Sequence, residues 1–386
     1  MADGEQDGDL NAGDQPESVR PAQHSVEELL AAEQALAELE LATEYRLEHE
    51  AFLRRRRKSV RICFTLFVLT FLSTTIVGAD FLPLRILYGI YSPDYGQQLK
   101  LALDQLIPSA QPMTLVDRFW QSVSRGCTYS VPLMVILFAH EMGHYLQAVR
   151  YSIPASLPYF IPLPLPPMGT MGAVILQGEG GADRRKMFDV AVSGPIAGLV
   201  VTIPVLLYGI HTSGYIPKTM TRVFEFGQPL ILQWLIESVH GKAVLGLAFH
   251  WNGFATAGWV GVFITAMNLL PIGQLDGGHI LYTLIRRPAH YVAWGLILAA
   301  VGIMIDRGLY SYLLLLVLLM VTGPRHPPTA DDSVPLGVTR HIVGWITLSF
   351  LLIGFTLQPI VIADGTESAA IQLPPLEEQA VPLPAE

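Results

Sequence analysis

The sequence is poor in charged residues and in cysteine. Only 15% of its 386 residues are Asp, Glu, Lys or Arg, whereas 51% are hydrophobic, and the mean hydropathy is +0.41. A soluble domain needs more charge than this to cover its surface, so the composition predicts a polytopic membrane protein. The chain has 2 cysteines, which excludes a disulfide framework and a cysteine metal cluster.

The chain also lacks the basic surface of a nucleic-acid-binding protein. Its net charge is -9, and much of the acid lies in residues 1–50 and 364–386. This distribution excludes a protein that reads DNA or RNA through a basic face. The basic run at 54–58 directly precedes an apolar stretch, where Lys and Arg mark the cytosolic end of a membrane span. We therefore expect a cytosolic N-terminus.

Composition divides the chain into four parts. Residues 1–24 are rich in Gly, Asp, Gln and Pro, which predicts a disordered acidic N-terminus. Residues 25–60 predict a charged cytosolic helix that ends in the basic cluster, either solvated or docked on a partner as a coiled coil. Residues 61–362 form the apolar membrane domain, and residues 363–386 an acidic, Pro-rich tail.

Within the membrane domain, seven apolar segments approach the length that crosses a bilayer. They cover residues 62–79, 127–149, 187–211, 254–270, 290–305, 309–322 and 342–362. The fifth and sixth segments are short and are compatible with a tilted pair or a re-entrant hairpin. We therefore expect an all-α polytopic membrane protein with about six to seven transmembrane helices.

The second apolar segment contains the pattern H-E-x-x-H. His140 and His144 are four residues apart, so on a helix both imidazoles face the same metal ion. Glu141 can hold or deprotonate the water that such a metal activates. Each charged group at mid-bilayer costs about 2–3 kcal/mol, and a metal site compensates for this cost. Zinc is favoured because it takes neutral imidazoles and keeps an open position. A polar cluster between helices is the alternative.

A third ligand is expected from the end of the fourth apolar segment, where residues 268–278 are N-L-L-P-I-G-Q-L-D-G-G. The proline and the first glycine should end the helix. The glycine pair after Asp276 permits a close approach of the backbone to a metal. Asp276 is then a carboxylate at membrane depth and the candidate third ligand. The alternative is a turn-forming Asp in an interfacial loop.

Together these two patterns resemble those of the site-2 protease family of intramembrane zinc metalloproteases. That family pairs the H-E-x-x-H helix with a later N-x-x-P-x-x-x-x-D-G loop, and both match at every fixed position. The resemblance implies that His140, His144 and Asp276 bind one Zn²⁺ ion and that Glu141 is the general base. Asn268 falls where the family has an asparagine that steadies the substrate or its oxyanion. A hydrogen bond between helices is an equally good reading of Asn268.

Residues 159–162, 169–175 and 323–328 extend the resemblance to the bacterial and plastid branch that is related to the EGY-type proteases. No insertion suggests a PDZ or CBS domain. The S-G-P-I-A-G stretch at 193–198 has small residues that allow close helix packing, and we expect only that role for it.

The loop after the histidine-bearing segment predicts a small re-entrant β element beside a three-helix catalytic core. Five prolines between 158 and 167 force an extended backbone, and 172–177 is expected to be a short strand. The edge of this strand could hold an unwound substrate segment by adding it as a further strand. A purely structural hairpin is the alternative.

The resemblance implies that residues 61–362 hydrolyse peptide bonds of membrane-anchored proteins with zinc-activated water, in regulated intramembrane proteolysis. The implied partners are a substrate's transmembrane segment and the lipid bilayer, with no nucleic acid. The implied location is multi-pass in a bacterial inner membrane. The alternative from another functional class is a non-catalytic metal transporter or scaffold. A transporter ordinarily shows several acidic and histidine sites along a path.

Overall fold

The computed structural model describes residues 59–80, 82–84, 100, 113–177, 182–217, 224–242, 247–308, 312–324 and 326–362. The chain divides into two units, Met1–Lys58 and Ser59–Glu386, and all described residues belong to the second. The disordered N-terminus predicted for 1–24, nearly all of the helix predicted for 25–60, and the tail predicted for 363–386 lie outside the described residues.

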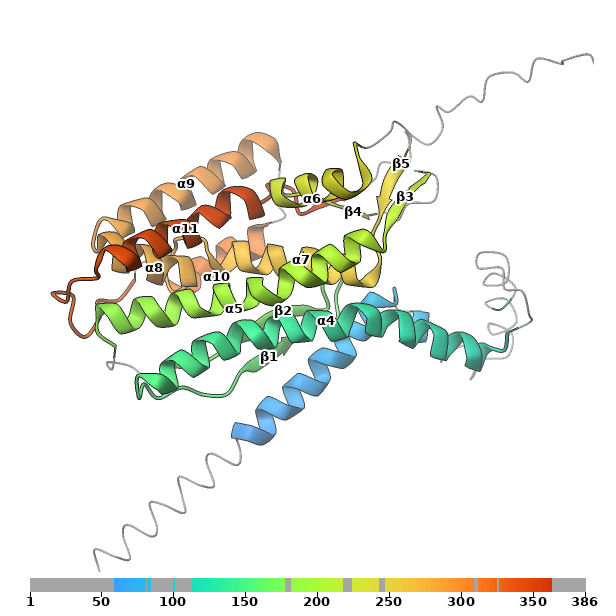
Figure 1. Ribbon diagram of the computed structural model, residues 1–386, viewed down its shortest axis with the longest axis horizontal. Helices are drawn as coiled ribbons and strands as arrows, with labels where there is room; N and C mark the ends of the chain where they lie inside the picture. The colour runs from blue at the N-terminus through green and yellow to red at the C-terminus, as the bar shows by residue number, and fades with distance from the viewer. Residues whose placement is uncertain are drawn as a thin grey trace, which may run out of the picture. The chain divides into compact units, whose positions relative to one another are not determined.

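Three helices form the centre of the described structure (Figure 1). Helices α4 (Leu115–Arg150) and α5 (Arg184–His211) run side by side, and α7 (Gly253–Asn268) packs against both. Helix α8 (Asp276–Ile285) follows α7 after a break and packs on α5. The proline and glycine residues at 271 and 273 were expected to end the helix near this point, and the structure shows a non-helical segment there.

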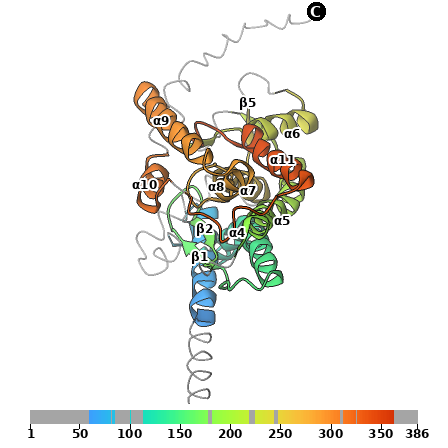
Figure 2. The same cartoon turned by 90° about the vertical axis from the view of Figure 1, so that its left-hand side faces the viewer.

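Further helices surround this centre. They are the helix Ser59–Gly78, α6 (Leu230–His240), α9 (Ala289–Arg307), α10 (Leu313–Thr322) and α11 (Val338–Gly354). Helix α11 contacts α5, α7 and α8, whereas α9 contacts α8. Seen from the side in Figure 2, α7 and α8 lie near the middle, with α5 and α11 on one side and α9 and α10 on the other.

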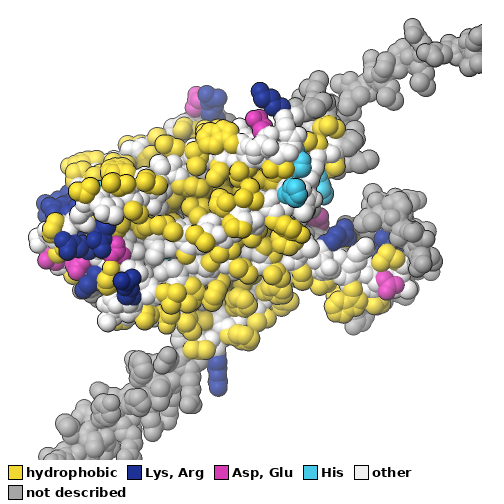
Figure 3. All heavy atoms as spheres, viewed as in Figure 1, with side chains coloured by type: hydrophobic (Ala, Val, Ile, Leu, Met, Phe, Trp, Pro, Cys, Tyr) yellow, Lys and Arg dark blue, Asp and Glu magenta, His cyan; other side chains and the backbone are white. Residues whose placement is uncertain are grey.

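Four helices are long and apolar enough to cross a membrane: Ser59–Gly78, Leu115–Arg150, Arg184–His211 and Ala289–Arg307. No more than half of each apolar window is buried inside the protein. Hydrophobic side chains cover the middle of the face shown in Figure 3, and Lys and Arg gather near its margins. These features agree with a polytopic membrane protein. The fourth and sixth predicted segments form helices of 16 and 10 residues, so the count of six to seven spans stays a prediction.

The part of the chain that the structure describes also contains three two-stranded antiparallel sheets. They pair β1 (Tyr159–Pro162) with β2 (Thr170–Val174), β3 (Gly214–Pro217) with β5 (Leu247–His250), and β4 (Phe224–Phe226) with β6 (Ile360–Ile362). The strand predicted at 172–177 thus begins and ends earlier, at 170 and 174. Sequence analysis missed the other two sheets, and the last predicted span ends as a helix at Gly354 before β6.

The β1–β2 hairpin is fastened to the helix Ser59–Gly78. The Phe67 ring meets the Phe160 ring edge to face, with centroids 5.1 Å apart. The Ser73 hydroxyl donates a hydrogen bond of 2.7 Å to the Gly169 carbonyl. The hairpin is therefore attached to this helix, and its strand β2 also contacts α4.

Candidate metal centre

The two histidines of the H-E-x-x-H pattern lie one turn apart on α4. Their ring centroids are 4.9 Å apart, and the two Nε2 atoms are separated by 3.2 Å. Both side chains are buried, at 4% exposure for His140 and 6% for His144. The spacing of four residues therefore places both imidazoles on one face of the helix.

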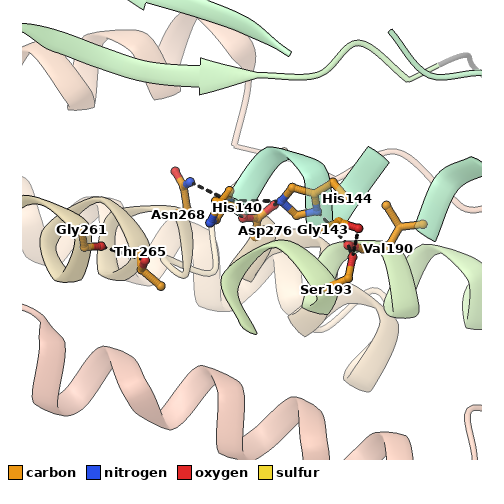
Figure 4. Close-up of polar contacts among 9 residues, drawn as sticks. All are labelled: His140, Gly143, His144, Val190, Ser193, Gly261, Thr265, Asn268 and Asp276. Carbon is orange, nitrogen blue, oxygen red and sulfur yellow. Dashed lines mark hydrogen bonds and ion pairs between the residues drawn. The ribbon is translucent and has the colours of Figure 1, made fainter. Parts of the chain in front are cut away.

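Helix α5 orients His144. The Val190 carbonyl lies 2.8 Å from His144 Nδ1, and a carbonyl oxygen only accepts, so Nδ1 carries the proton. The Nε2 atom is then left with its lone pair facing the centre of the site, as a metal ligand requires. The Ser193 hydroxyl lies 2.7 Å from the Val190 carbonyl and 3.0 Å from the Gly143 carbonyl, so it ties α5 to α4 at the same level (Figure 4).

Two glycines of α5 make room for the imidazoles. A Cβ atom at Gly194 would lie 2.0 Å from His144 Nε2, and one at Gly198 would lie 3.1 Å from His140 Nδ1. Sequence analysis expected the stretch that contains both glycines to serve helix packing alone. The G-x-x-x-G spacing of these glycines indicated a close helix contact. It could not indicate that the contacted residues are the two histidines, because that depends on how α5 packs on α4.

The break between α7 and α8 brings the carboxylate to the histidines. Gly273 has φ +57, which favours glycine. A Cβ atom at Gly277 would lie 2.0 Å from the Leu269 carbonyl oxygen, so the chain folds back on itself more tightly than any other residue allows. As a result, Asp276 becomes the first residue of α8.

Asp276 completes a group of three possible ligands. Its Oδ2 atom lies 3.2 Å from His140 Nε2, and its Oδ1 atom lies 3.3 Å from His144 Nε2. Ligands on a tetrahedral zinc ion at about 2.0 Å are separated by about 3.3 Å from one another. Asp276 Oδ2 is buried and has no hydrogen bond from the described residues. The donor set therefore fits a divalent metal ion such as zinc.

Glu141 and Asn268 flank this group. Glu141 follows the first histidine on α4 and is buried, at 5% exposure. Asn268 is the last residue of α7, and its amide nitrogen lies 3.3 Å from His140 Nε2 (Figure 4). The structure thus gathers all five residues singled out in the sequence around one cavity of about 360 Å³.

The opposite wall of this cavity is extended backbone, residues 173–177. Both backbone groups of Leu176 are hydrogen-bonded to Ser156. The Leu176 carbonyl accepts a bond of 2.9 Å from the Ser156 N–H, and the Leu176 N–H donates a bond of 2.9 Å to Ser156 Oγ. Peptide groups alternate in direction along an extended chain. The peptide of Ile175 therefore points away from Ser156, and its N–H hydrogen-bonds the Glu141 carboxylate. Among the described strands, β2 pairs with β1 alone.

His279 lines the same cavity. It lies three residues after Asp276 on α8, whereas His326 lies in the loop between α10 and α11. The structure brings the two together, with His279 Nδ1 at 2.5 Å from His326 Nε2. Nothing local in the sequence connects two residues 47 positions apart.

Comparison with known proteins identifies the region that holds this site. Residues 128–305 match the model of peptidase family M50. The chain is 28% identical over 266 residues to "Probable zinc metalloprotease EGY1, chloroplastic" of Arabidopsis thaliana, covering 66% of this chain and 46% of the relative. The protein of the same name from Oryza sativa subsp. japonica is 28% identical over 234 residues, or 59% and 40% of the two chains.

"Probable zinc metalloprotease EGY2, chloroplastic" of Arabidopsis thaliana is 26% identical over 211 residues, or 52% of this chain and 36% of the relative. The chain thus spans less than half the length of these relatives. No solved structure matches. The residues that match the family model include most of α4, all of α5, α7 and α8, and the three possible metal ligands with Glu141 and Asn268. Residues 128–305 of this chain are thus similar to peptidase family M50, and they contain the H-E-x-x-H and N-x-x-P-x-x-x-x-D-G patterns that resemble those of the site-2 protease family.

Proposed function

We propose that this protein is an intramembrane zinc metalloprotease that hydrolyses peptide bonds of membrane-anchored proteins. One observation carries the proposal: the ligand atoms of His140, His144 and Asp276 lie within 4.8 Å of one another, in a cavity that Glu141 also lines. The family match and the names of the relatives support a zinc protease.

His140, His144 and Asp276 would hold one zinc ion. When bound, zinc supplies a Lewis acid that polarises the scissile carbonyl and lowers the pKa of water. Glu141 acts as the general base: it takes the proton of the attacking water and passes it to the leaving amine. The Asn268 amide donates a hydrogen bond to the carbonyl oxygen as negative charge develops there.

The extended segment 173–177 holds the substrate in this proposal. A transmembrane helix cannot be cut while its carbonyls are tied up in helical hydrogen bonds, so the cleaved segment must be unwound. An unwound segment can pair with the edge of β2, in the manner of an added strand. Residues 173–177 support this role because they line the same cavity as the three possible metal ligands.

The proposal extends to regulated intramembrane proteolysis in a bacterial inner membrane, with the N-terminus in the cytosol. Lys and Arg favour the cytosolic ends of spans. Arg150, Arg184 and Arg340 lie at ends of α4, α5 and α11, and α5 contacts both of the other helices. The names of the relatives describe them as chloroplastic, so the membrane that contains this protein has to be determined by localising the tagged chain. A reporter fused to the N-terminus tests whether that end of the chain lies in the cytosol.

The substitution Glu141→Gln tests the mechanism. The full chain, reconstituted in proteoliposomes with a single-pass test protein, should keep its zinc and lose at least about 100-fold in cleavage rate, since general-base catalysis contributes on the order of 10²–10⁴. Glu237→Gln, the same substitution at an exposed position on α6, is the matched control and should cleave normally.

A Glu141→Gln variant that cleaves at the wild-type rate would remove this residue from the mechanism. Zinc uptake into the proteoliposomes without cleavage by the wild type would favour a transporter instead. Comparative membrane proteomics of cells with wild type or Glu141→Gln identifies the substrate, as a membrane-anchored protein that accumulates in the variant.

A further inference from the structure

Residues 326–337, which we call the brace, connect α10 to α11 without helical structure and contact both halves of the metal centre. One half is α4 with α5, which carries and orients the histidines. The other half is α8, which carries Asp276. The proposed mechanism gives the brace no part.

On the α8 side, the brace contacts the turn that follows Asp276. His326 is buried, at 5% exposure. Its Nε2 atom lies 2.5 Å from His279 Nδ1, and its ring stacks on the Tyr282 ring, with centroids 4.4 Å apart and 16° between the planes. The Tyr282 hydroxyl donates a hydrogen bond of 2.7 Å to Asp332 in the brace. Two side chains of α8 are therefore held by one loop.

The direction of the bond between the two histidines follows from their surroundings. Burial and the neighbouring His279 lower the pKa of His326 to about 3, so its ring is neutral at physiological pH. His326 Nδ1 lies in hydrogen-bond contact with the Pro327 carbonyl, which only accepts, so the proton of His326 is on Nδ1. His326 Nε2 is then an acceptor, and His279 Nδ1 donates to it. The contact fixes the position of the His279 ring.

On the α5 side, the brace is bonded to the start of the helix. The Ala330 N–H donates to the Ala182 carbonyl at 3.0 Å, and the Arg184 N–H donates to the Asp331 carbonyl at 3.2 Å. The buried Arg184 guanidinium also reaches α8, where Nε donates to the Thr283 carbonyl at 2.7 Å. The start of α5, the brace and the end of α8 are therefore joined by hydrogen bonds.

Asp276 depends on such support because of its place in the chain. It is the first residue of a ten-residue helix, and the preceding Leu275 makes no side-chain capping bond. A metal ligand must lie within about 0.2 Å of its ideal distance. The position of the carboxylate therefore depends on what holds the rest of α8.

We propose that His326 is a positioning residue for the metal centre: by holding His279 and Tyr282, it sets α8 so that the Asp276 carboxylate meets the two histidines of α4. This inference rests on the proposed zinc site. It assigns a role to a buried histidine that lies outside both metal-binding motifs.

The test measures zinc binding by the full chain in detergent, by competition with a chelating dye. His326→Ala should weaken zinc binding about 10- to 100-fold, which is the usual loss when a residue that orients the metal ligands without binding the metal is removed. It should also lower kcat more than it raises KM for a test substrate. His326→Gln, whose side-chain oxygen can accept from His279, should recover part of the loss. His240→Ala is the matched control, because His240 also binds a buried backbone carbonyl, that of Ile210 at 2.7 Å, but on α6.

Two results would overturn the inference: wild-type zinc affinity in His326→Ala, or a loss no larger than that of His240→Ala. Should His326→Ala not fold, Tyr282→Leu decides, because it removes the ring on which His326 stacks. It should weaken zinc binding several-fold, and an unchanged affinity overturns the inference. A wild-type chain that binds no zinc is a separate result, which rejects the metal centre itself.

Discussion

The substitution Gly194→Ala tests the geometry of the metal centre most directly, because it adds one methyl group to α5 beside His144. The new Cβ would lie 2.0 Å from His144 Nε2 and 2.3 Å from Cε1 of the same ring. Non-bonded carbon atoms prefer about 3.5 Å or more, so the ring must move by more than about 1 Å. His144 is buried and hydrogen-bonded to the Val190 carbonyl, so its ring cannot move aside without breaking this bond or displacing its neighbours.

The expected consequence is the loss of one metal ligand. A displacement of about 1 Å exceeds the tolerance of about 0.2 Å in a metal–ligand distance. We expect zinc affinity to fall at least about 100-fold, which corresponds to about 2.8 kcal/mol. Competition between the purified chain and a zinc-chelating dye measures this directly, without a substrate.

Two further glycines make a graded series. Gly198→Ala places its Cβ 3.1 Å from His140 Nδ1, so a shift of a few tenths of an ångström suffices and the loss should be smaller. Gly302→Ala is the control in α9, where a Cβ meets nothing within 4 Å. It should leave zinc affinity unchanged. The reasoning is refuted if Gly194→Ala binds zinc as tightly as Gly302→Ala.

Three other predictions follow from the site and its support. Ile175→Pro removes the N–H at the edge of the cavity wall, so cleavage should be lost while zinc stays bound; normal cleavage would reject strand addition. Asn268→Ala should lower kcat about 10²- to 10³-fold with zinc retained, whereas an unchanged kcat would leave Asn268 a packing role. The folded pKa of His326 lies below its unfolded value of about 6.5, so only the unfolded state gains a proton as pH falls below 6.5. The melting temperature of the zinc-free chain should therefore drop more between pH 7 and pH 5 in wild type than in His326→Gln; equal slopes would contradict the burial of a neutral His326.

The parts of the site that local chemistry determines could be predicted from the sequence. A spacing of four residues is enough to place His140 beside His144 on a helix. The glycine-rich break before and after Asp276 gave a physical reason for a carboxylate to approach them. The roles of the individual residues in catalysis stay predictions, because they await the variants described above.

Features that depend on distant partners could not be predicted. Strand β4 pairs Phe224 with Ile362, and no local pattern announces a partner so far along the chain. Gly194 acts through the helix it faces, so its effect is visible only once α5 is packed on α4. The bond between His279 and His326 could not be predicted for the same reason, since the partner of a loop histidine depends on which helix the loop packs against.

The two walls of the cavity around the possible metal ligands belong to different parts of the chain. The histidines and Asp276 are on α4 and α8, whereas the hairpin that leads into the opposite wall is fastened to the first membrane helix through Phe67 and Ser73. A helix in a bilayer tilts to match its hydrophobic length to the lipid thickness. Under the proposed function, the tilt of this helix therefore affects how a peptide fits between the two walls, while the possible metal ligands on α4 and α8 stay in place.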